Sequence, residues 1–215
     1  MFGYISATAF GKHPAESTIQ LPCFKFLLAL ATLALVPLGS STSQAGEFKG
    51  VVGIGWDMLG GDTVVTGTCT ACGTPEQKAN NGLAFNVGGV IINDAYETQA
   101  TIGYKYGSPV GENGTISWEA IPLEIIQFYR TSNLRIGLGF IYQINPRLVV
   151  DVPGLNYENN YDSAFGTLVQ LGWAPVGEAY TIELRYSPVT YKQNNSAYPQ
   201  EVNGSVFGIF SNYYF

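Results

Sequence analysis

This sequence has almost no histidine and fewer basic than acidic residues. Its 215 residues include a single histidine, His13, and charged residues make up only 12% of the chain, with a formal net charge of −6. An acidic chain offers no basic face to neutralise phosphates, which argues against a nucleic-acid partner. Aromatic residues reach 13%, with 14 tyrosines and 26 glycines. Abundant tyrosine favours strands, and the balance is unusual for a cytosolic globule.

Long hydrophobic runs are also rare, and the one clear example is Phe26 to Val36. It is too short to span a bilayer but suits the core of a secretory signal, since Lys25 precedes it and Ser43 to Ala45 form a small-x-small cleavage site. The alternative, a buried helix of the mature protein, is disfavoured by the proline, glycine and serines that follow at once. We therefore predict that residues 1–45 are an N-terminal extension with a cleavable signal peptide and that residues 46–215 form the mature domain.

The mature part of the sequence alternates with a period of two. In residues 96–106, one parity carries Tyr96, Ile102 and Tyr104, and the other carries Glu97 and Lys105. Such alternation is the signature of a strand with two different faces. Eight segments show it: 48–58, 83–92, 96–106, 116–130, 134–144, 165–173, 180–187 and 205–215. In the fourth, Pro122 interrupts the pattern and predicts a bulge near Ile121.

Charged and amide residues share one parity of these segments with glycine, whereas tyrosine, tryptophan and aliphatic residues occupy the other. Small and ionic residues suit the crowded lumen of an eight-stranded barrel, and eight apolar faces suit lipid but would aggregate in water. The pattern therefore predicts an all-β, eight-stranded antiparallel up-and-down transmembrane β-barrel rather than a soluble carrier.

The connections alternate between short and long. Turns near residues 93–94, 132–133 and 175–178 are short, whereas segments 60–81, 109–114, 145–162 and 193–203 are longer or more polar. Bacterial barrels keep tight turns at the periplasm, so we expect both termini on the periplasmic side. The first and last strands must pair, since an open edge cannot be satisfied in hydrocarbon.

Over residues 46–215 the chain resembles the small eight-stranded outer-membrane barrels of OmpA/OmpX type. The most specific element is the C-terminal strand, where Phe207, Ile209, Tyr213 and Phe215 share one parity, although Ser211 interrupts it. The resemblance implies a location in the bacterial outer membrane, contact with lipid and lipopolysaccharide, and recognition of these four residues by the barrel-assembly machinery. An aromatic girdle at the membrane surface is the alternative role for them.

Histidine is absent from the predicted mature chain, which excludes a histidine general base. A mechanism based on a pair of carboxylates remains conceivable, but paired charges that fill the interior are the favoured interpretation, so we expect no enzymatic activity and no cofactor. The charged residues of the strands are expected to form an ion-pair network that fills the lumen, and they are Lys49, Asp57, Glu97, Lys105, Glu119, Arg135, Glu183 and Arg185.

Two cysteines, Cys69 and Cys72, lie in the first long connection. A zinc site needs about four ligands, and the mature chain supplies no histidine and no further cysteine, so no metal site is expected. A loop disulfide is favoured over free thiols in a secreted chain.

The sequence leaves two functions open. The first is a non-enzymatic outer-membrane protein whose loops on the cell surface have a structural, adhesive or interaction role. The alternative is a narrow channel or small-solute conduit.

Overall fold

The computed structural model describes residues 46–66, 76–109, 114–194 and 200–215. The predicted signal peptide, and the predicted pairing of Cys69 with Cys72, lie outside these residues. Within them, no helix is long and apolar enough to cross a membrane.

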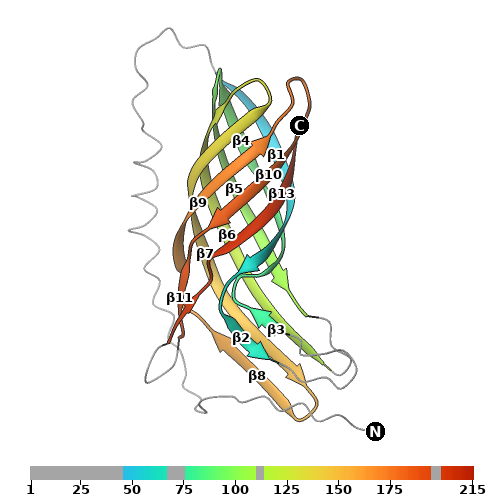
Figure 1. Ribbon diagram of the computed structural model, residues 1–215, viewed down its shortest axis with the longest axis vertical. Helices are drawn as coiled ribbons and strands as arrows, with labels where there is room; N and C mark the ends of the chain where they lie inside the picture. The colour runs from blue at the N-terminus through green and yellow to red at the C-terminus, as the bar shows by residue number, and fades with distance from the viewer. Residues whose placement is uncertain (1–45, 67–75, 110–113, 195–199) are drawn as a thin grey trace. The chain divides into compact units, whose positions relative to one another are not determined.

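Eight strands form a closed antiparallel ring (Figure 1). Around the ring they follow the order β6, β5, β4, β1, β13, β10, β9 and β7, and pairing of β7 with β6 closes it. Their bounds are β1 (Glu47–Gly60), β4 (Gly82–Asn93), β5 (Tyr96–Gly107), β6 (Thr115–Arg130), β7 (Leu134–Val152), β9 (Ala164–Trp173), β10 (Tyr180–Ser187) and β13 (Val206–Tyr214). The predicted fold class and all eight predicted strands are confirmed.

The strands of the ring alternate between inward, buried residues and outward, exposed residues, as their sequence pattern predicts. In β9, every second residue from Ala164 is buried and every intervening residue from Phe165 is exposed. Because successive side chains point to opposite faces of a strand, one parity lines the lumen and the other covers the outer wall.

The two ends of the barrel differ. At one end, which we call the turn end, lie the three short connections, the start of β1 and the end of β13 (Figure 1). At the other end, β6 and β7 continue beyond the ring and meet short strands, namely β2 (Thr63–Thr66), β3 (Glu76–Lys78), β8 (Leu155–Asn160), β11 (Thr190–Lys192) and β12 (Glu201–Asn203). We call these five strands, with residues 115–119 and 145–152 of β6 and β7, the cap.

Part of the cap differs from the sequence prediction. Residues 145–162 were expected to be a polar loop, but β7 runs on to Val152 and returns as β8. Pro153 and Gly154 make the turn, and Gly154 has φ +86°, the conformation that glycine supplies in a type II turn. The apolar residues Leu148 and Val150 give this hairpin a buried face.

A bulge at Asn145 reverses the parity of β7. The register with β6 advances two residues from Glu119 to Ile121 but three from Ile144 to Arg147, and Asn145 has φ +48°. The irregularity expected near Ile121 is present, but its extra residue lies on β7. Residues of odd number face inward before the bulge, and residues of even number do so after it.

The reversal gives the cap an apolar core of its own. The rings of Tyr161 and Tyr191 lie 5.0 and 5.1 Å from the ring of Trp118. Buried aliphatic residues surround this trio, and they are Ala79, Leu148, Val150, Val152, Ala164 and Val189. The interior of the ring therefore holds buried charged residues beside a small apolar cluster of Ile126, Phe128, Ile141 and Leu168, whereas the interior of the cap is an apolar core.

Candidate functional site: a filled lumen under a cap

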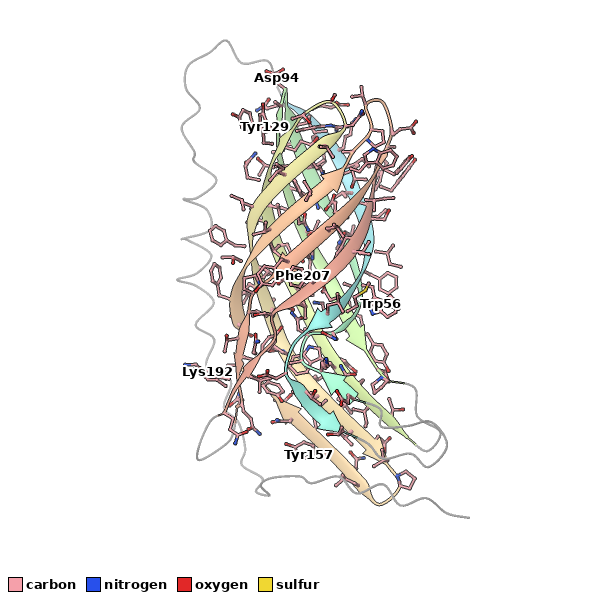
Figure 2. The ribbon with its side chains drawn as sticks, in the orientation of Figure 1. Trp56, Asp94, Tyr129, Tyr157, Lys192 and Phe207 are labelled. Carbon is pink, nitrogen blue, oxygen red and sulfur yellow. The ribbon has the colours of Figure 1, made fainter. Side chains whose placement is uncertain are left out.

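The outer wall of the ring is covered by exposed apolar side chains. Ile136 is 55% exposed, whereas its inward neighbour on β7, Arg135, is 1% exposed. Figure 2 shows Trp56 and Phe207 on the outside of the wall. Every strand of the ring contributes, for example with Ile54, Phe85, Ile102, Ile121, Leu138, Val169, Leu184 and Ile209. A continuous apolar exterior around a polar interior is the arrangement that lipid stabilises and water does not, so the ring is a transmembrane β-barrel.

The lumen near the turn end is closed by a cluster around Arg135. Its Nη1 donates to Glu97 at 2.8 Å, and its Nη2 contacts Glu183. Glu97 also accepts from Arg130 at 2.9 Å, and Arg130 reaches the carbonyl of Ala174 in a neighbouring turn at 3.1 Å. These bonds connect strands on different sides of the ring.

A second layer lies around Arg185. Two of its nitrogens donate to the two oxygens of Glu124 at 2.7 and 3.0 Å, and its guanidinium lies 3.6 Å from the ring centre of Phe210. With its amide oriented to satisfy both sides, Gln170 accepts from Arg185 and donates to Glu183 at 3.0 Å. Gln170 therefore connects this layer to the first.

The third layer lies beneath the cap, where Lys105 forms an ion pair with Asp57. Lys105 also donates to Oδ1 of Asn80 at 2.7 Å, and Gln143 donates to the same oxygen at 3.3 Å. Asn80 comes from the connection between β3 and β4 and donates in turn to the carbonyl of Gly204 at 2.9 Å.

The three layers balance in charge. Their carboxylates are Asp57, Glu97, Glu124 and Glu183, and their cations are Lys105, Arg130, Arg135 and Arg185. A charge taken out of water is costly unless it is paired and hydrogen bonded, and each of these eight has a partner of opposite sign. The network fills the lumen with groups that oppose entry of a further ion.

Six of the eight residues expected in the lumen lie there, and two do not. Lys49 lies near the turn end and pairs with Glu47 at 3.4 Å, both partly exposed. Glu119 was expected inside and lies on the outer wall instead, where its carboxylate bonds Arg147 at 2.6 Å. The reason is parity, because the even-numbered residues of β6 face inward.

Other participants in these layers were not among the eight predicted residues. Glu124 and Arg130 could have been found, since both share the even parity of β6 that lines the lumen. No periodic signal could have found Asn80, because it comes from a connection and enters the lumen through tertiary structure.

The C-terminal strand presents its predicted residues to the outside. Phe207, Ile209, Tyr213 and Phe215 are between 46% and 69% exposed, and Phe210 on the opposite parity is buried. They therefore lie where either an assembly factor or lipid could contact them.

Burial changes the acidity of the cap tyrosines. It raises the pKa of Tyr161 to about 12, with a smaller contribution from neighbouring Tyr157. It raises the pKa of Tyr191 well above its ordinary value, and nearby Asp57 adds to the effect. Both phenols stay neutral at physiological pH, so neither supplies a base. In the described ranges no three potential metal ligands gather.

Comparisons with known proteins give similarity in structure only. No family model and no curated protein matches the sequence. The crystal structure of Neisserial surface protein A matches 80% of this chain and 100% of its own, with 11% identity and a TM-score of 0.47. The solid-state NMR structure of outer membrane protein AlkL in lipid bilayers matches 83% and 95%, with 11% identity and a TM-score of 0.38. Because both TM-scores are under 0.5, the fold assignment depends on the strand pairing of this chain itself.

Proposed function

We propose that the protein is a non-enzymatic integral protein of the bacterial outer membrane whose cap carries a structural, adhesive or interaction role at the cell surface. The apolar outer wall supports the membrane location. The short turns at one end support an orientation with the turn end and both termini in the periplasm and the cap outside. Residues 1–45 would then act as the export signal and be removed.

One observation favours a surface role over a narrow channel, and it is the filled lumen. Three successive layers of paired charges cross it, and the cap adds an apolar core above them. A solute would have to separate buried ion pairs to pass, which is costly in a medium of low dielectric constant.

Planar bilayers test this choice directly. Purified protein at neutral pH should give no steady conductance, and liposomes that contain it should not leak small solutes. A stable conductance in the wild-type protein would instead establish the channel alternative.

Cell-surface labelling tests the location and the orientation. An epitope inserted at Gly154, in the turn of the β7–β8 hairpin, should be reached by antibody on intact cells, whereas one inserted at Gly177, at the turn end, should not. Both glycines have open space around the position of an added side chain, which makes them a matched pair. The reverse labelling would contradict the orientation.

Two partners follow from this location. Outer-membrane lipid, including lipopolysaccharide, would contact the apolar wall, and the barrel-assembly machinery would recognise Phe207, Ile209, Tyr213 and Phe215 during insertion. Replacing Phe215 by Ala should therefore slow insertion in cells while leaving refolding into synthetic bilayers less affected, and equal defects in both would point to a girdle role alone.

A further inference from the structure

Asn80 occupies an unusual position for a residue outside the ring. It is fully buried, and its backbone has φ +64°, a conformation that asparagine tolerates better than most residues. Its side chain uses one oxygen to accept from Lys105 and Gln143 of the ring and its nitrogen to donate to Gly204, which precedes β13. The side-chain amide of Asn80 therefore joins three parts of the protein: the first connection, between β1 and β4; the lumen; and the last connection, between β10 and β13.

The neighbouring residue makes a different contact. Asn81 donates to the carbonyl of Met58 on β1 at 3.2 Å, and its side chain makes no hydrogen bond to the described part of the last connection. Asn80 differs from Asn81 in one respect, since its side chain bonds the connection between β1 and β4 to the connection before β13.

The strand pairing around this amide is short. β2, β3, β11 and β12 have only three or four residues each, and the first and last connections meet in few backbone bonds, such as Asp62 N to Asn203 O at 2.7 Å. Closure also buries the indole nitrogen of Trp118 and the hydroxyl of Tyr191 without hydrogen-bond partners among the described residues. A buried polar group without a partner destabilises the closed form and gains water when the cap opens.

We propose that the β2–β3 and β11–β12 pairs open reversibly as a unit, and that Asn80 is the latch that holds them closed over the lumen. Opening brings Trp118, Tyr191 and the Asp57–Lys105 pair into contact with external water. The layers around Arg185 and Arg135 stay in place, so opening does not make a channel. The proposed opening of the cap is therefore independent of the proposed surface function, and the conductance experiment does not test it.

Fluorescence of Trp118 reports opening. In the variant W56F/W173F, Trp118 is the sole tryptophan, because the sequence contains three. Its quenching by aqueous iodide should be weak in the otherwise unchanged protein. Asn80→Gly keeps the backbone conformation and removes the side chain, and Asn80→Asp keeps the acceptor oxygen but loses the donor to Gly204. Both should raise the quenching constant roughly threefold or more, as local opening allows, with Asn81→Ala as the unchanged control.

Amide hydrogen exchange separates a latch from general damage. In Asn80→Gly and Asn80→Asp, exchange should accelerate in β2, β3, β11 and β12 and stay unchanged in β4 and β5 of the ring. Heat-modifiable gel mobility confirms that each variant is folded. Quenching that matches the control in both variants, or faster exchange throughout the ring, would overturn the latch.

Discussion

The ring of Phe215 lies over the α-carbon of Gly50, and the two residues exchange backbone hydrogen bonds. Gly50 N donates to Phe215 O at 2.8 Å, and Phe215 N donates to Gly50 O at 3.0 Å. A β-carbon at Gly50 would lie 2.5 Å from Cε2 of the Phe215 ring. Phe215 thus extends the pairing of β1 with β13 and covers the backbone of Gly50 on the outer face.

Gly50→Val should displace the side chain of Phe215 and lower the free energy of unfolding by about 1–3 kcal/mol, the usual cost of overpacking. Phe215→Ala makes room, so the double variant should lose less than the sum of the two single losses. Urea unfolding in detergent measures each value. Thr167→Val, on the exposed face of β9, is the control and should change little. If the losses in the free energy of unfolding are additive, the side chain of Phe215 and Gly50 do not interact.

Removal of Arg135 should be among the most damaging substitutions in the lumen. Arg135→Met leaves Glu97 and Glu183 buried with one cation fewer, and breaking a buried pair in this way costs about 3–5 kcal/mol. The matched control is Lys192→Ala, which breaks the exposed pair with Glu201 at 3.3 Å and should cost no more than about 1 kcal/mol. Equilibrium unfolding by urea checks both. Equal small losses would show that the Arg135 cluster is not sealed from water.

Asn145 should tolerate glycine but not a β-branched residue. Its φ of +48° is left-handed, so Asn145→Val should cost about 1–2 kcal/mol, whereas Asn145→Gly should be close to neutral. Insertion of one alanine after Asn145 should be worse than either, since it would turn Leu148 and Val150 outward. Thermal unfolding of the three variants measures the order, and a neutral insertion would contradict the inward placement of these two residues.

Alkali should loosen the cap through Tyr161. Burial raises the pKa of this phenol from 10.0 to about 12, so the folded cap favours the neutral form. A raised folded-state pKa gives a stabilisation that is complete below pH 10 and is lost as pH rises toward 12. Absorbance of tyrosinate, compared between wild type and Tyr161→Phe, should show the missing phenol titrating near pH 12. Titration of that phenol at its ordinary pH would show that Tyr161 is exposed.

Period-two alternation was sufficient to predict the ring, because each strand has one face in lipid and one in a polar lumen. The same rule placed Asp57, Lys105 and Arg135 inside. The assignment of Glu119 to the lumen was wrong because it followed the charge of the residue, whereas Glu119 shares the outward parity of β6.

The cap was not predictable in the same way. The inward-facing residues of β7 change from odd to even numbers at Asn145. Asn80 reaches the lumen from a connection between strands. Both features depend on tertiary structure, so the alternation of residues along a strand does not predict them. The dipeptide Pro153–Gly154 is typical of a turn, but the polar residues beside it favoured a loop over a hairpin.

Lipid-borne quenching of tryptophan tests the central claim most directly. Proteins with Trp56, Trp118 or Trp173 as sole tryptophan would be refolded into bilayers with brominated acyl chains. Trp56 and Trp173 lie on the outer wall at 55% and 45% exposure, and Trp118 is fully buried under the cap. The account predicts strong quenching of Trp56 and Trp173 and little quenching of Trp118. Strong quenching of Trp118 with protection of the other two would contradict it.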